Sequence, residues 1–116
     1  MPLQDWSEST LIVELNDEPM FSEDFDALMG RLESTDNDAP DVILNLLGVS
    51  RLNSSNLSQL LRLRKTLMGR DRRLRICSVD DSVWSVFLVT GLEQLFSFTD
   101  DVATSLASLQ IESPHE

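Results

Sequence analysis

Two adjacent serines, Ser54 and Ser55, are the residues whose type and position best suit a chemical modification. They lie in the run Asn53-Ser54-Ser55-Asn56, in which every residue is a good helix N-cap, so a helix is expected to begin here. A serine at a helix start is accessible to a kinase, and a phosphate there adds about −1.5 to −2 charge and three acceptor oxygens. The helix dipole and the free backbone amides tolerate that charge. The alternative is that both serines only cap the helix.

Other chemistries lack the residues that they need. His115, the only histidine, lies near the C-terminus, and Cys77 is the only cysteine, so neither a zinc site nor a Ser-His-Asp hydrolase is expected. The four glycines are scattered, which excludes a glycine-rich phosphate loop. We interpret the twenty Asp and Glu residues as solvated surface charge, because no pair of them is marked for acid–base catalysis. We therefore expect no catalytic residue, no metal, no cofactor and no enzyme.

Composition and charge are typical of one globular domain that neither binds nucleic acid nor inserts into a membrane. The chain has 116 residues, of which 41% are apolar, and a formal net charge of −11, which repels nucleic acid. The longest apolar run, residues 86–89, is too short to enter a membrane as a spanning helix, and the first residues lack the positive charge of a secretory signal. A single cysteine favours a cytoplasmic location.

The basic residues are concentrated in one segment. Seven of the nine Lys and Arg residues lie between Arg62 and Arg75, whereas residues 1–41 and 80–116 are strongly acidic. This segregation predicts one basic patch on an acidic body. The patch is either a solvated helix end or a docking surface for an acidic partner.

The spacing of apolar residues predicts alternating strands and helices. Apolar runs predict strands at residues 11–15, 42–47 and 73–79 and a short one at 95–98; Cys77 is expected on the polar side of its strand or at a partly covered edge. Helical spacing predicts helices that begin near Ser22, near Asn53, near Asp80 or Asp81, and within Thr99-Asp100-Asp101. Ser22 is the expected N-cap of the first helix. The expected apolar face of the second helix is Leu57, Leu60, Leu61, Leu67 and Met68. This alternation favours an α/β fold with largely parallel strands. A single domain is expected over residues 10–110, with a loose arm at 1–9 and a tail at 111–116.

The segment from Val42 to Leu57 resembles the core signature of STAS domains, the sulfate transporter and anti-sigma factor antagonist family. It reads VILNLLGVSRLNSSNL, an apolar strand and a Gly-Val-Ser turn followed by the motif that the family writes Asp-Ser-Ser-Gly-Leu at a helix start. Residues 60–65 are similar to the family's basic second helix, and residues 90–96 to its Thr-Gly-Leu segment. The resemblance covers roughly residues 10–110.

The resemblance implies both a fold and a function. The STAS fold is an α/β fold with a small mixed sheet of four to five strands and four helices packed mostly on one side. Bacterial members of the anti-sigma factor antagonist type have no catalytic activity. They bind an anti-sigma factor that is also a serine protein kinase, release it when phosphorylated, and are restored by a cognate phosphatase.

The position in the motif assigns the phosphorylation to Ser54, with Ser55 as the second choice. The partner surface implied by the resemblance covers the loop and helix start and the exposed side of the same helix, namely Ser50, Arg51, Asn53, Ser54, Ser55, Asn56, Leu57, Arg62 and Lys65.

Two departures from the family pattern keep a second function open. Asn53 and Asn56 replace the family's Asp and Gly; Asn53 keeps an acceptor without the charge, and Asn56 is expected to tolerate unusual backbone angles. Residues 16–20 replace a Gly-Glu-Leu-Asp-like segment of the partner surface. The alternative is therefore a STAS interaction module without phosphorylation, either a scaffold subunit or the cytosolic component of a lipid-transport complex.

Overall fold

Strands and helices alternate along the chain in the computed structural model, which describes residues 3–7, 9–34 and 39–111. The strands are β1 (Leu3–Ser7), β2 (Thr10–Asn16), β3 (Asp41–Gly48), β4 (Leu74–Cys77) and β5 (Phe98–Thr99). The helices are α1 (Met20–Glu33), α2 (Ser54–Gly69), α3 (Asp81–Thr90) and α4 (Val102–Ile111), with a 3-10 turn at Leu92–Leu95. Residues 112–116 of the expected tail lie outside the described residues. No described helix combines the length and the apolar character that a bilayer crossing needs.

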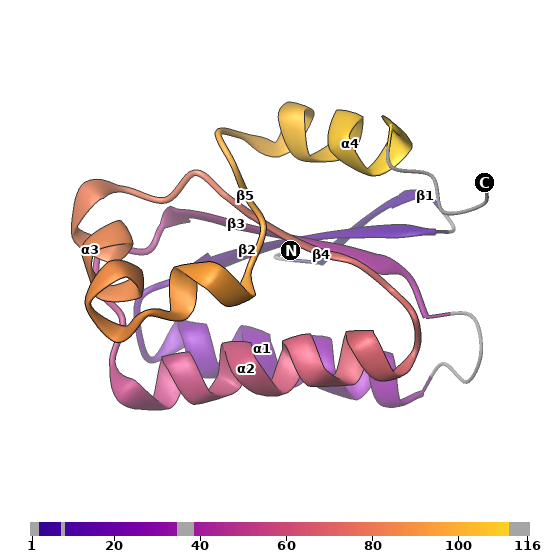
Figure 1. Ribbon diagram of the computed structural model, residues 1–116. Helices are drawn as coiled ribbons and strands as arrows, with labels where there is room; N and C mark the ends of the chain where they lie inside the picture. The colour runs from indigo at the N-terminus through magenta and orange to yellow at the C-terminus, as the bar shows by residue number, and fades with distance from the viewer. Residues whose placement is uncertain (1–2, 8, 35–38, 112–116) are drawn as a thin grey trace.

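The five strands form one mixed sheet in the order β1-β2-β3-β4-β5. β1 pairs with β2 in the antiparallel sense, and the other neighbours are parallel. Helices α1 and α2 cover one face of this sheet, α4 covers the other, and α3 lies at one end (Figure 1). The predicted α/β fold with a small mixed sheet is therefore confirmed.

The arrangement of the helices follows from the strand order. Each parallel strand is added beside its predecessor in the same direction, and right-handed crossovers that step in one direction place their helices on one face. The main core accordingly joins that face of the sheet to α1, α2 and α3, with Phe25, Leu44, Leu60 and Phe87 fully buried within it.

Residues 3–7 form a strand, although the sequence predicted a loose arm over residues 1–9. The backbone of β1 pairs with Leu11–Val13 of β2. Without β1, the outer edge of β2 would leave its backbone donors and acceptors unpaired. The arm thus completes the sheet.

Ser22 is not the N-cap of α1. The helix begins at Met20, two residues before the predicted cap, with Pro19 in the N-cap position and no side-chain capping bond from it. The Glu18 carboxylate takes over the capping role, because its Oε1 accepts the backbone N–H of Ser22 at 3.0 Å. The caps of α3 and α4 lie among the residues predicted for them. They are Asp80 and Asp101, since their carboxylates accept the N–H groups of Val83 and Thr104.

The buried face of α2 shares Leu60 and Leu67 with the predicted face and differs from it at the other positions. The buried residues are Asn56, Leu60, Leu63 and Leu67, and Met68 is 59% exposed. The predicted short strand at 95–98 is also displaced, since residues 92–95 form the 3-10 turn and β5 begins at Phe98.

Cys77 is fully buried, whereas the sequence predicted a polar or partly covered position. The second face of β4 is not solvated, because α4 packs on it and encloses Cys77 with Ile12, Ile43 and Leu109. This burial raises the pKa of the Cys77 thiol.

We expect the Cys77 thiol to react with a soluble disulfide reagent at neutral pH at least about 100-fold more slowly in the native chain than in the urea-unfolded chain. Burial withholds the sulfur from the reagent, and the raised pKa reduces the thiolate fraction. The measurement is the rate of chromophore release from Ellman's reagent in buffer and in urea. Similar rates in both solutions would contradict a stably docked α4.

Candidate functional site

The first two residues of α2 are Ser54 and Ser55, as the sequence predicted. Asn53 is the N-cap, with extended backbone angles (φ −104°, ψ 177°), and its Oδ1 accepts the N–H of Asn56 at 2.8 Å. The Asn56 Oδ1 in turn accepts the N–H of Asn53 at 3.1 Å. This reciprocal capping box fixes the helix start, so the serines are not needed as caps.

Both serines are exposed to solvent. Within the described residues, neither hydroxyl has a hydrogen-bond partner, and no carboxylate or histidine contacts Ser54 in the manner of a catalytic base. Both hydroxyls are therefore accessible to a protein that supplies a base and a phosphoryl group.

Asn56 is buried, which corrects its predicted place on the partner surface. Its side chain is held inside, because Nδ2 donates to Glu18 Oε2 at 2.9 Å and to Gln59 Oε1 at 3.2 Å, and the residue is only 2% exposed. Asn56 lies in regular helix and not at unusual backbone angles. Its contribution at this position is therefore the hydrogen bonding of its side-chain amide. Asn56 therefore stabilises the start of α2 from a buried position and does not belong to the exposed surface.

The turn after β2 is tied to the loop after β3 by Asp17. Its Oδ1 accepts the Ser50 N–H at 2.9 Å and the Arg51 N–H at 3.3 Å, and its Oδ2 accepts the Ser50 hydroxyl at 2.6 Å. The Ser50 bonds, and more weakly the Arg51 charge, hold the pKa of Asp17 below its ordinary value. The segment that departs from the family pattern is thus part of the same site.

The neighbouring Glu18 ties the same turn to both helix starts. Its carboxylate accepts the Ser22 hydroxyl at 2.6 Å and the Ser22 N–H on α1, in addition to the Asn56 amide of α2. These bonds, with the Ser22 hydroxyl first, lower the pKa of Glu18. Gln59 closes the network by donating to the Ser22 Oγ at 3.1 Å.

We expect Ser50→Ala to lower the free energy of unfolding at neutral pH by no more than about 1 kcal/mol, because the Asp17–Ser50 contact is solvent-exposed. A carboxylate with a lowered folded pKa stabilises the fold above its ordinary value of 3.8 and loses this contribution as the pH falls through the folded value. The difference from wild type should therefore shrink in acid. Urea titrations across this range measure it, with the exposed Ser58→Ala as a pH-independent control; a constant difference for Ser50→Ala would contradict the assignment.

A pocket of about 370 Å³ lies beside the start of α2. It is lined by Asp17, Glu18, Arg51, Leu52, Asn53 and Asn56. Its wall combines one guanidinium, two carboxylates and an apolar side chain, a mixture typical of a protein contact surface. Among the described residues, no group of three or more His, Cys, Asp or Glu residues could hold a metal ion.

The other residues of the predicted partner surface divide into two sets. Ser50, Arg51 and Asn53 are exposed around the pocket, whereas Leu57 is half-buried against the core. Arg62 and Lys65 are exposed further along α2, roughly 12 to 17 Å from Ser54 at 1.5 Å per residue. Arg62 forms an ion pair of 3.4 Å with Glu33 of α1.

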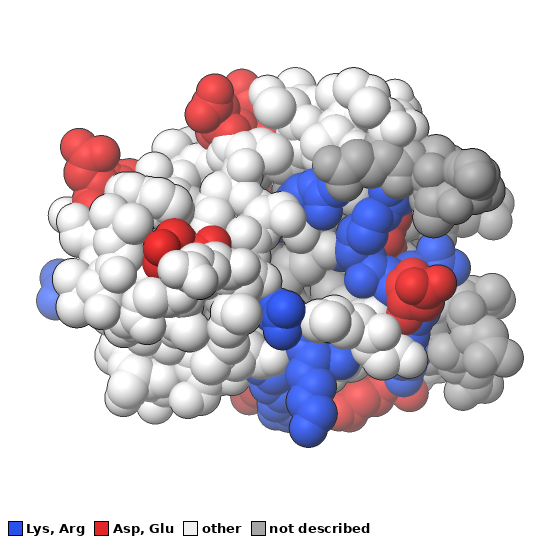
Figure 2. All heavy atoms as spheres, viewed as in Figure 1, with Lys and Arg blue, Asp and Glu red and all other residues white. Residues whose placement is uncertain are grey.

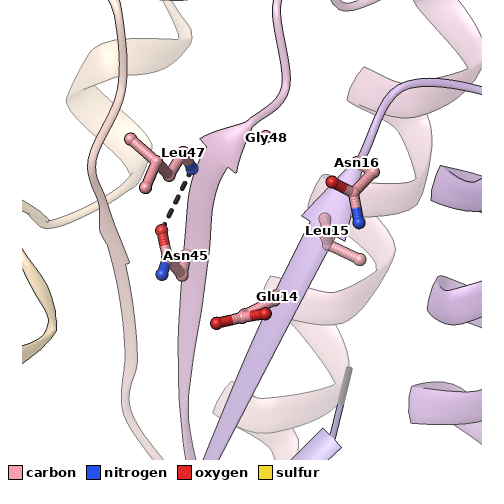
Figure 3. Close-up of a pocket in the computed structure, with 6 residues that line it drawn as sticks. All are labelled: Glu14, Leu15, Asn16, Asn45, Leu47 and Gly48. Atoms are coloured by element: carbon pink, nitrogen blue, oxygen red, sulfur yellow. Dashed lines mark hydrogen bonds between the residues drawn. The ribbon is translucent and has the colours of Figure 1, made fainter. Parts of the chain in front are cut away.

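Sequence reasoning missed a second, shallow pocket of about 230 Å³ at the carboxyl ends of β2 and β3 (Figure 3). Glu14 and Asn45 face each other across the strands, and the Asn45 Oδ1 accepts the Leu47 N–H at 3.0 Å. Leu47 is 79% exposed. The signal was present in the sequence, since Asn45 interrupts an otherwise apolar strand.

The chain was compared with known proteins. The family model for the STAS domain matches residues 5–105. No curated protein sequence matches the chain.

Solved structures share the fold at low sequence identity. A proposed anti-sigma factor antagonist from Thermotoga maritima has a TM-score of 0.80 at 14% identity, with 94% of this chain and 93% of that chain covered. A STAS domain protein from Planctomyces limnophilus, described as an anti-sigma factor antagonist, has a TM-score of 0.78 at 15% identity, with coverage of 93% and 97%. A serine-to-glutamate variant of RsbS from Moorella thermoacetica has a TM-score of 0.76 at 9% identity, with coverage of 97% and 99%.

Proposed function

This chain belongs to the STAS domain family, and from that premise we propose that it is a cytoplasmic, non-enzymatic anti-sigma factor antagonist. In this proposal it binds an anti-sigma factor that is also a serine protein kinase. Phosphorylation of Ser54 ends the binding, and a cognate phosphatase restores it. The structural neighbours described as anti-sigma factor antagonists support this choice within the family.

The observation that carries the proposal is the exposed Ser54 at the first position of a rigidly capped helix. The capping box uses Asn53 and Asn56 and leaves the Ser54 hydroxyl available. A phosphate at this position meets the positive end of the helix dipole and free backbone amides, so the fold tolerates it.

A partner packed over Ser54 does not tolerate the phosphate. Burying a phosphate at an interface, or placing it against carboxylates, costs several kcal/mol, which corresponds to at least a hundredfold loss of affinity. The same modification is therefore mild for the fold and severe for the complex, which is the property that a partner switch requires.

Exposed side chains define the surface that the partner would cover. Ser54, Arg62 and Lys65 lie on the exposed side of α2, and Ser50 and Arg51 flank the helix start. The three basic side chains favour a partner that presents acidic residues here.

The test compares Ser54→Glu with Ser82→Glu in titrations of the anti-sigma factor. Ser82 is a matched control, because it is an exposed serine in the first turn of α3, after the N-cap Asp80. We expect Ser54→Glu to weaken binding about 100-fold or more and Ser82→Glu to leave it within about twofold. Mass spectrometry of the wild-type chain after incubation with the partner and ATP should place the phosphate on Ser54 rather than Ser55.

The neutral Asn53 before Ser54 favours the second candidate function, an interaction module without a switch, because the family's Asp is missing from the kinase recognition site. Under that reading the chain itself is a scaffold subunit or the cytosolic component of a lipid-transport complex. Ser54→Glu would then bind as wild type does, and the partner would transfer no phosphate to the chain.

A further inference from the structure

A basic groove lies at the end of α2 opposite Ser54. It has a volume of about 200 Å³ and is lined by residues 72–75 and 95–97 together with Arg64, Leu67 and Met68. Figure 2 shows that Lys and Arg side chains gather on this face of an otherwise acidic molecule. The segment from Arg62 to Arg75 contains seven basic residues and one acidic residue, Asp71.

The groove exists because β5 is short. β5 pairs only with Ile76 and Cys77, and the Ser97 carbonyl accepts the Ile76 N–H at 2.9 Å. Before this point the chain diverges from β4 toward α2. Among the described strands, none pairs with Leu74 on that side, so the start of β4 is open to a ligand.

Two arginines supply charge that the described protein groups do not neutralise. The Nε of Arg64 donates to the Leu95 carbonyl at 2.7 Å, which holds its guanidinium at the groove. Within the described residues, the other donors of Arg64 and the half-buried Arg72 side chain have no protein partner. Arg73 and Arg75, by contrast, have protein partners. Arg73 donates to Asp41 in the sheet, and Arg75 donates to Ser108 of α4.

Apolar side chains lie beside these charges. Met68 is 59% exposed and Leu95 is 40% exposed, and both line the groove. A ligand that satisfies both features carries carboxylates for the guanidinium groups and apolar side chains for Met68 and Leu95. Nucleic acid offers no such apolar side chains, and the net charge of −11 repels a long polyanion.

We propose that this groove binds a short acidic segment of a partner protein, in which Asp or Glu alternates with apolar residues. Arg64 lies about 15 Å from Ser54 along the helix, at 1.5 Å per residue, so the groove is a second docking surface. Binding at this groove does not depend on the function proposed for Ser54, because a partner can occupy one surface without contacting the other.

The test uses a fluorescein-labelled peptide of about ten residues that alternates Asp and Leu, with an Asn-for-Asp peptide as its control. In anisotropy titrations with the full chain, the acidic peptide should bind and the Asn peptide should not. Added salt should weaken the binding of the acidic peptide. Arg64→Gln and Arg72→Gln should each weaken it about tenfold. Arg31→Gln, the same charge change at an exposed position in the last turn of α1 and outside the groove, should change it less than about twofold. Ser54→Glu should leave it unchanged.

Amide NMR spectra place the peptide and show whether each variant is folded. Shifts at Leu74 and Leu95 without shifts at Ser54 support the groove. Equal binding of the Asn peptide, an equal effect of Arg31→Gln and Arg72→Gln, or displacement of the peptide by inorganic phosphate or a single-stranded oligonucleotide would each overturn the proposal. Because Ser54→Glu is tested separately with the anti-sigma factor, failure here leaves the proposed function standing.

Discussion

Asn56→Asp is expected to lower the free energy of unfolding by about 3 kcal/mol at neutral pH. The native Nδ2 group donates to Glu18 and Gln59 in a position that is only 2% exposed. Aspartate replaces this donor by an acceptor that carries a negative charge, which then faces the Glu18 carboxylate. The deficit should shrink in acid, because a protonated carboxyl group can donate again.

Asn53→Asp is the matched control for this variant, because it makes the same chemical change at the exposed residue of the same capping box. Aspartate caps a helix as well as asparagine does, so its effect should stay within about 0.5 kcal/mol. Urea unfolding followed by circular dichroism measures both. Equal stability of the two variants would mean that the Asn56 amide does not hold the helix start.

Phe87→Ala is expected to lower the free energy of unfolding by about 3 to 5 kcal/mol. Phe87 is completely buried in α3, with its ring edge-to-face against Phe96 at 5.9 Å and Phe98 at 5.0 Å between centroids. Alanine removes the ring and leaves a cavity between α3 and β5. These contacts join α3 to β5 and to the segment before it.

Val89→Ala on the same helix is the control, because Val89 is 86% exposed and its truncation should cost less than about 0.5 kcal/mol. Denaturant midpoints of the three proteins give the comparison. A cost for Phe87→Ala below about 1 kcal/mol would show that α3 is loosely packed and that its aromatic contacts contribute little.

The alternation of strands and helices could be predicted because it depends on local periodicity. The strand at 42–47 and the helix starts at Asn53, Asp80 and Asp101 carry their own apolar and capping signals. The burial of Cys77 could not be predicted, because it depends on contact with α4, which is distant in the sequence. The strand β1 escaped prediction because its pairing with the neighbouring β2, and no apolar pattern of its own, makes it a strand. Ser22 failed as a cap because Glu18, four residues earlier, supplies the acceptor.

The start of α2, which carries the candidate site, was predicted from the sequence, but the contacts that hold it in place were not. Ser54 and Ser55 are exposed at the helix start, as expected from the capping residues around them. The burial of Asn56 escaped prediction because its partner Glu18 is 38 residues away in the sequence. A local pattern shows that an asparagine can cap a helix, but it does not show which loop will cover it.

The order of the strands in the sheet has a consequence for how the chain folds during synthesis. Each strand pairs with the one made immediately before it, and no later strand is inserted between two earlier ones. Each parallel pairing therefore closes a loop that holds a single helix unit, and no pairing waits for a segment made later in the chain. As the chain leaves the ribosome, the hairpin of β1 and β2 can serve as a template on which each later helix–strand unit is added in turn. The last unit, α4, then closes the second face of the sheet over Cys77.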